Sequence, residues 1–361
     1  MNRRLLALMT ALCLLLGGCS WRDGNYVSIK QHQQQLSGTQ SGSLTAANYQ
    51  QLRQVLSGLV EAGTESAVIH VAEYRQDLVE KGMETGVHYI CDLLPLGAYA
   101  VNDVTYEIGT VGGQPAISVT ISYIHGRSEL RKVRRVENMA QAKEIIGEVL
   151  GQCGEGVVLL VDSYSDMDIS QLTEDFAAEN PNLIMETPQV AVGLYPDSGI
   201  SRVVELKFTY QTSRDALRQM QTQVQRVFAS AALYVSSDGE ESQKFSQFYT
   251  FLMERFNYKV ETSITPAYSL LCHGVGDSEA FATVFAAMCR NAGLECHTVS
   301  GTRAGEAWFW NMIREGDVYY HVDLLQSKAA GQLQRWTDDQ MQGYVWDYSA
   351  YPAAGSNAAD R

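Results

Sequence analysis

The chain alternates between stretches with helix-like spacing of apolar residues and short apolar runs that are typical of strands. From Leu44 onward, apolar residues recur every three or four positions, which predicts an amphipathic helix that ends at Gly63. The apolar positions are Tyr49, Leu52, Val55, Leu56, Leu59 and Val60. One face of this helix is therefore expected to lie against a core.

The next part of the chain contains an internal repeat. The runs Ala67–Tyr74 (AVIHVAEY) and Val157–Tyr164 (VVLLVDSY) are similar, and each precedes a helix-like segment, at 75–91 and 169–179 respectively. Two alternating strand-like segments follow in each copy, turning at Gly112-Gly113 and at Pro196-Asp197-Ser198-Gly199, and a charged amphipathic helix ends each copy. This pattern predicts two strand-helix-strand-strand-helix repeats within residues 65–233. The alternative is one α/β domain with chance similarity.

A second domain is predicted after a polar turn at 236–241 (SSDGEE). Apolar spacing from Phe245 to Phe256 predicts a new amphipathic helix. The block Tyr268–Asp323 then predicts a strand-like stretch, a helix that starts at Asp277 or Ser278, a second strand and a hairpin that turns at 315–317. The fold class is therefore α+β, with an antiparallel sheet packed on a helix behind an α/β repeat region.

The first residues predict export. Arg3 and Arg4 precede the apolar run Leu5–Leu16, which is too short to span a membrane and fits a secretory signal peptide. The ending Leu16-Gly17-Gly18-Cys19 resembles the lipobox of bacterial lipoproteins. That resemblance implies that Cys19 is the lipid attachment site, carrying acyl chains such as palmitate on the extracytoplasmic face of the cell membrane. The alternative is an ordinary signal peptide with an incidental cysteine.

Charge and composition narrow the classes of partner. The formal net charge is −14, and loss of the first 18 residues with Arg3 and Arg4 would make it −16. Such an acidic chain is not expected to bind nucleic acid or anionic lipid headgroups. With 361 residues and 45% hydrophobic content, it is long enough for more than one core. The predicted divisions are a signal peptide at 1–18, a flexible Gln- and Ser-rich tether at 19–43, a repeat domain at 44–235 and a second domain at 236–361.

The remaining cysteines show no metal-binding spacing. Cys91, Cys153, Cys272, Cys289 and Cys296 form no Cys-x-x-Cys pair and no Cys/His zinc pattern, so neither a metal nor a cofactor is expected. They are interpreted mainly as small buried apolar residues. A disulfide among the last three is the alternative, since the exterior of the cell is oxidising.

The second domain resembles the bacterial transglutaminase-like (papain-related cysteine) superfamily. In that family a Cys opens a helix of the form Cys-Glu-Gly-Tyr-Ala-x-x-Phe, followed by Cys-x-x-Ala-Gly-Ile, a His-Ala-Trp-Asn strand and a Trp-Tyr-His-Val-Asp strand. Three segments here are similar: Ser278–Leu294 (SEAFATVFAAMCRNAGL), Trp308–Asn311 (WFWN) and Tyr319–Asp323 (YYHVD). The tail at 336–352 is similar to the family's closing segment. The resemblance covers about residues 240–352 and implies a papain-like fold.

Two of the three catalytic positions implied by this resemblance hold unsuitable residues. Ser278 stands where the family has its nucleophilic Cys, Trp308 stands where it has its His, and only the acid, Asp323, is kept. A serine hydroxyl needs a neighbouring base to become a nucleophile, and an indole N–H can only donate a hydrogen bond. The prediction is a pseudoenzyme with no catalytic residue.

The alternative is an active hydrolase or acyl transferase that uses Ser278, served by His321, or uses Cys272. A third alternative is a structural envelope protein without a ligand. As a binding module, the domain is expected to offer Trp308, Trp310 and His321 in a cleft for a peptide or a glycan. Trp308 and Trp310 should face the same side of their strand. The indole of Trp308 is expected to fill the cleft and donate to Asp323 or to a backbone carbonyl, rather than form an exposed platform.

Overall fold

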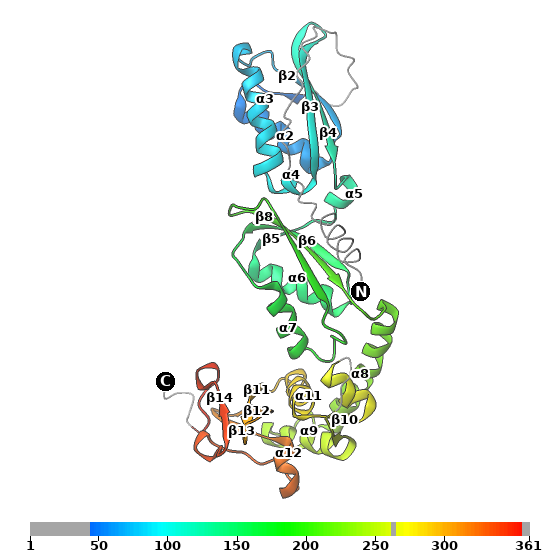
Figure 1. Cartoon of the computed structure of the whole chain (residues 1–361), viewed down its shortest axis with the longest axis vertical. Coiled ribbons are helices and arrows are strands. Elements are labelled where there is room, and N and C mark those ends of the chain that lie inside the picture. The colour runs from blue at the N-terminus through cyan, green and yellow to red at the C-terminus, as the bar shows by residue number, and fades with distance from the viewer. Residues whose placement is uncertain (1–43, 261–264, 356–361) are drawn as a thin grey trace, which may run out of the picture. The chain divides into compact units, whose positions relative to one another are not determined.

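A computed structural model describes residues 44–260 and 265–355. The predicted signal peptide, Cys19 and the tether at 19–43 lie outside the described residues. The described chain divides into two compact units, one formed by residues 44–91 and 100–127 and the other by 92–99 and 128–355. Helices and mostly antiparallel sheets make up both units, which confirms the α+β class (Figure 1). The domain limits at 235 and 236 stay predictions.

The first unit is a four-stranded sheet in the order β1-β2-β4-β3, accompanied by helices. Its first two strands are parallel, and the others are antiparallel. The elements are β1 (Leu44–Thr45), α2 (Tyr49–Ala62), β2 (Ser66–His70), a 3-10 turn (Gln76–Leu78), α3 (Val79–His88), β3 (Val101–Val111) and β4 (Gln114–Tyr123). The short helix α5 (Arg127–Leu130) follows at the boundary with the second unit. A π-helical turn (Tyr89–Leu93) and α4 (Pro95–Ala100) lie between α3 and β3.

The second unit opens with a sheet of the same design. Its order is β5-β6-β8-β7, again with one parallel pair followed by antiparallel pairs. The elements are β5 (Arg134–Asn138), α6 (Met139–Gly151), β6 (Gly156–Ser163), α7 (Ile169–Glu179), β7 (Gln189–Tyr195), β8 (Arg202–Thr209) and α8 (Arg214–Tyr234). The predicted internal repeat is therefore confirmed.

The two copies agree down to the way in which their first helices are capped. Asn48 caps α2 and Asn138 caps α6, each in extended backbone conformation with the side chain accepting main-chain N–H bonds. Three residues later, Gln51 and Gln141 each accept a bond from the main-chain N–H just before the cap, at 2.8 Å in both copies. This reciprocal pattern is similar to a capping box, with the bond displaced to the residue before the cap, and it helps to fix the start of each helix.

The repeat unit is longer at its start than the sequence pattern predicted. Each copy begins with a short parallel strand and a capped helix. These elements are β1 and α2 in the first copy and β5 and α6 in the second. The helix expected at the end of the first copy is only α5, with four residues, whereas α8 has 21. The opening strands escaped detection because β1 has two residues and β5 (RRVEN) buries only Val136.

The last part of the second unit is a helix packed on an antiparallel sheet in the order β13-β12-β11-β14. Its main elements are α9 (Glu241–Arg255), α11 (Ser278–Asn291), β11 (Cys296–Arg303), β12 (Glu306–Glu315), β13 (Val318–Val322), α12 (Leu324–Ser327) and β14 (Tyr344–Trp346). Short pieces are β9 (Asn257–Tyr258), α10 (Pro266–Tyr268), a π-helical turn (Ser269–His273), β10 (Val275–Gly276) and 3-10 turns at 328–330, 338–340 and 348–350. The stretch before α11, predicted as a strand, is helical because a short apolar run fits either structure.

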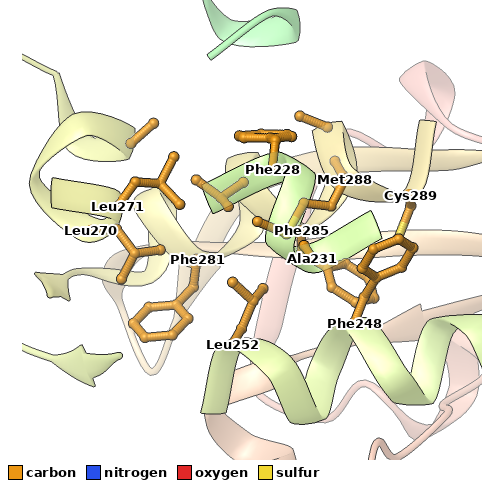
Figure 2. Packing of buried hydrophobic residues seen from close by; sticks show 14 of the residues in the cluster. Phe228, Ala231, Phe248, Leu252, Leu270, Leu271, Phe281, Phe285, Met288 and Cys289 are labelled. Atoms are coloured by element: carbon orange, nitrogen blue, oxygen red, sulfur yellow. The ribbon is translucent and has the colours of Figure 1, made fainter. Parts of the chain in front are cut away.

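Two layers of core enclose this sheet. Helix α11 buries ten residues, and Phe281, Phe285 and Met288 pack with side chains from α8 and α9 on one face (Figure 2). The opposite face carries an aromatic cluster built around Trp310 and Trp346. Among the described helices, none is both long and apolar enough to cross a membrane.

Candidate functional site

The start of α11 presents the first residue of interest, Ser278. Asp277 caps the helix by accepting a bond from the N–H of Ala280 at 3.0 Å, so Ser278 is the first helical residue and not the cap. Its side-chain oxygen accepts a bond from the backbone N–H of Phe309 at 3.3 Å, and the residue is only 6% exposed. In the described part of the chain, no imidazole bonds this hydroxyl.

The carboxylate of Asp323 joins three elements of the domain. Its Oδ2 accepts bonds from the indole Nε1 of Trp308 at 2.7 Å and from the hydroxyl of Tyr344 at 2.8 Å. Its Oδ1 accepts from the backbone N–H of Gln326 at 3.0 Å and so caps α12. Burial and the nearby Asp323 charge raise the pKa of Tyr344, which keeps its hydroxyl a donor at neutral pH. With three donors in place, this carboxylate holds strand β12, strand β14 and helix α12 together.

The indole of Trp308 makes the contact with Asp323 that the sequence predicted. Trp308 also packs against the same aromatic cluster as Trp310, which confirms that the two residues share one face of β12. The indole is half-buried and not enclosed: the ring of Tyr258 lies 6.0 Å away and the guanidinium of Arg303 lies 5.3 Å from its centre. Trp308 therefore packs against Asp323 and the aromatic cluster, while part of its side chain remains exposed to solvent.

A second chain of polar contacts starts inside the aromatic cluster and ends at the partly exposed Asp338. The indole of Trp310 donates to Nδ1 of His321 at 3.0 Å, and Nε2 of His321 lies 2.9 Å from a carboxylate oxygen of Asp338. This arrangement fixes the neutral ring with its proton on Nε2, pointing to Asp338. Burial lowers the pKa of His321, against the opposing effect of Asp338. Both ring nitrogens are occupied, so His321 has none left to serve Ser278 as a base.

The predicted cleft therefore needs correction. Trp310 and His321 are both fully buried, because they face the cluster closed by Trp346, and neither can line an open cleft in this structure. Only Trp308 keeps exposed surface. Four residues that contact Trp308, Asp323 or His321 were not predicted from the sequence: Tyr258, Arg303, Asp338 and Tyr344. The available signal was that Asp338 and Tyr344 lie in the tail resembling the family's closing segment.

The cysteines show no sign of activation. Burial raises the pKa of the Cys272 thiol, which its hydrogen bond with Tyr268 offsets only in part. A thiol of raised pKa is a poor nucleophile at neutral pH. Cys272, Cys289 and Cys296 are free thiols in this structure, and burial together with the Cys296 thiol raises the pKa of Cys289. Within residues 44–260 and 265–355, no three ligating side chains gather into a metal site.

A comparison with protein-family models agrees with the motifs. Residues 229–348 match the model of the transglutaminase-like superfamily. A solved structure described as a TGase is 12% identical, over 47% of this chain and 51% of its own, with a TM-score of 0.27. A putative protease from Parabacteroides distasonis is 10% identical, over 76% of this chain and 40% of its own, with a TM-score of 0.22.

The chain thus spans about half the length of the first of these structures and 40% of the second, and likenesses this weak carry no argument on their own. A comparison with curated proteins gives no match. The family match coincides with the segment that contains Ser278, Trp308 and Asp323. Residues 229–348 therefore form a transglutaminase-like domain.

Proposed function

We propose that the transglutaminase-like domain is not catalytic and serves as a binding or structural module of the cell envelope. The observation that carries the proposal is the 2.7 Å bond from the indole of Trp308 to Asp323. An imidazole in this position would donate to the carboxylate and keep a second, basic nitrogen for a nucleophile. An indole reproduces the donor and supplies no base.

The surroundings of Ser278 support the same proposal. Its oxygen accepts from a backbone N–H, and no carboxylate bonds it within the described residues. A serine nucleophile needs a base within hydrogen-bond reach to take its proton. The helix N-terminus by itself stabilises an anion by about 0.3–2 kcal/mol, far less than is needed to ionise a hydroxyl at neutral pH.

The proposed location is the extracytoplasmic face of the membrane, through lipid on Cys19. This part rests on the sequence Leu16-Gly17-Gly18-Cys19 and on the basic and apolar segments before it. Two or more acyl chains give a stable anchor, because each buried methylene contributes about 0.8 kcal/mol. A polar tether at 20–43 would then hold the folded units away from the bilayer.

The exposed part of the Trp308 indole is the proposed contact for a peptide or a glycan. Tyr258 is 47% exposed beside it, and Arg303 lies over both Trp308 and Tyr344. Aromatic rings with an adjacent guanidinium offer stacking and hydrogen-bond donors to such ligands. Within the described residues, the carboxylate that contacts this indole, Asp323, is already bonded to three donors, so we expect a ligand here to be bound and released unchanged.

A nucleophile-directed probe tests the proposal without knowledge of a substrate. The purified chain is treated with a fluorophosphonate, which labels activated serines, and with iodoacetamide at pH 7, which labels activated thiols. We expect no labelling of Ser278 and only slow alkylation of Cys272, given its raised pKa. Rapid labelling that disappears in Ser278→Ala or Cys272→Ala would contradict the proposal.

A further inference from the structure

A cavity lies at the end of α11 remote from Ser278. Its volume is about 450 Å³, within the range of about 300–1,000 Å³ that is usual for small-molecule sites. Three helices of the second unit and the segment after α8 surround it. The lining residues are Gln225, Phe228, Ala229, Ala232, Val235, Ser236, Ser237, Lys244, Phe248, Met288, Asn291 and Ala292.

The floor of the cavity is apolar and firmly held. Phe228 of α8, Phe248 of α9 and Met288 of α11 are all buried members of the main core cluster, and Figure 2 shows them together. Side chains that also pack into a core keep their positions when a ligand binds, so the cavity is largely pre-formed. The floor would therefore accept an alkyl or aryl group.

The walls of the cavity also include one cation and several neutral polar residues. Lys244 is the sole charged residue in the lining, and it is half-buried. Glu240 and Glu241 precede it by about one helical turn, yet neither carboxylate forms an ion pair with its ammonium group among the described residues, and Glu241 instead accepts from the backbone N–H of Gly316. In a chain of net charge −14, a half-buried lysine without an ionic partner is available to a ligand.

We propose that this cavity binds a small amphipathic carboxylate. Its apolar tail would lie on Phe228, Phe248 and Met288, and its carboxylate would accept hydrogen bonds from Nζ of Lys244 at the rim. Burial of the tail supplies the apolar contribution to affinity, and the charge-assisted bond selects an acid over the corresponding alcohol. The site is separate from Trp308 and does not depend on whether the domain is catalytic.

Titration calorimetry with octanoate and 1-octanol tests the assignment on the purified full chain. We expect saturable octanoate binding that Lys244→Met weakens about tenfold or more, since the variant keeps the apolar stem and removes the charge. Binding of 1-octanol should be the same in both proteins. Lys143→Met is the matched control, because Lys143 is exposed on α6 outside the cavity.

A blocking variant locates the ligand. Ala232 lines the cavity from an exposed position of α8, so Ala232→Trp adds bulk at the opening with little demand on the core. We expect this variant to abolish octanoate binding while its denaturant midpoint stays near that of the parent. Absence of saturable octanoate binding by the parent overturns the proposal, as does octanoate affinity unchanged by Lys244→Met. Should Ala232→Trp not fold, the Lys244→Met comparison still decides.

Discussion

The two ends of helix α11 differ in whether nearby polar and charged groups are available to bind a ligand. At the N-terminal end, Ser278 accepts from a backbone N–H, and Asp323 is surrounded by three donors. At the C-terminal end, Met288 borders a cavity of about 450 Å³ whose lining includes Lys244, which has no ionic partner among the described residues. The charged group at the motif end is therefore bonded within the protein, whereas the charged group at the cavity end is available to a ligand.

This difference shows that resemblance in sequence and capacity for a ligand need not coincide. The resemblance in sequence draws attention to Ser278, Trp308 and Asp323, because it implies that these positions correspond to the catalytic ones. In this structure the indole of Trp308 bonds the carboxylate of Asp323 directly. A carboxylate whose oxygens are already bonded to three donors contributes to stability, and it is not available to a substrate.

The largest effect is expected from Trp308→Ala. The change removes a half-buried indole and one of the donors to Asp323, so the free energy of unfolding should fall by about 3 kcal/mol. Trp308→Phe keeps most of the apolar contact and should cost about half as much. Denaturant midpoints measure both. A loss under about 1 kcal/mol for Trp308→Ala would mean that the indole is an exposed platform and that the motif end is open.

The buried chain through His321 gives the next effect. His321→Phe leaves the indole N–H of Trp310 and a carboxylate oxygen of Asp338 without their partner, at a cost of about 2 kcal/mol. Because burial lowers the pKa of His321 below 6.5, the unfolded chain binds the proton more readily than the folded chain. The stability contributed by His321 is therefore present above about pH 6.5 and declines as the pH falls.

Thermal denaturation of the parent and His321→Phe between pH 8 and pH 5 checks this second prediction. The parent should lose more stability than the variant across that interval, so the difference between them should narrow toward pH 5. A constant difference would contradict the prediction, because it would show that folding leaves the pKa of His321 unchanged.

The sequence predicted the long helices and strands of this structure better than the short ones, because a longer element shows more repeats of its apolar pattern. Long amphipathic helices and hairpins with glycine turns were predicted from residue spacing, and the structure contains them at α2, α9, α11 and the β3–β4 pair. The two-residue β1 and the charged β5 could not be found, since a strand with one buried residue has no alternation to detect. The parallel opening of each repeat was missed for that reason.

At the candidate site, too, some contacts could be predicted from the sequence and others could not. The Trp308–Asp323 bond could be predicted because both residues lie in family motifs and an indole N–H needs an acceptor. The burial of Trp310 and His321 could not be predicted, because it depends on contacts with Trp346. That residue comes from a separate segment of the chain that returns to the sheet. The cavity at Lys244 leaves no motif in the sequence, since its lining comes from three helices and a connecting segment.

The capping residue gives a smaller effect that compares the two ends directly. Asp277→Ala removes the acceptor for the N–H of Ala280 and should cost about 1 kcal/mol. Asn291→Ala, at the exposed C-terminal end of α11, removes a side chain outside the core and should change the free energy of unfolding by less than about 0.5 kcal/mol. Urea denaturation of the two variants measures the contrast, and equal losses would contradict it.

Among the changes at the motif end of α11, the smallest effect is expected from Ser278→Ala, which would be the most damaging change in an active enzyme. The variant loses only a 3.3 Å bond accepted from the N–H of Phe309, at a cost of about 0.5 kcal/mol, because a neutral bond of this length contributes little net stability. The capping bond at Asp277 remains, so α11 should start at the same residue. Hydrolysis and acyl transfer toward glutamine peptides should be equally absent from parent and variant. An activity of the parent that falls by two or more orders of magnitude in Ser278→Ala would show that the hydroxyl finds a base in solution, and the motif end of α11 would then be the working end.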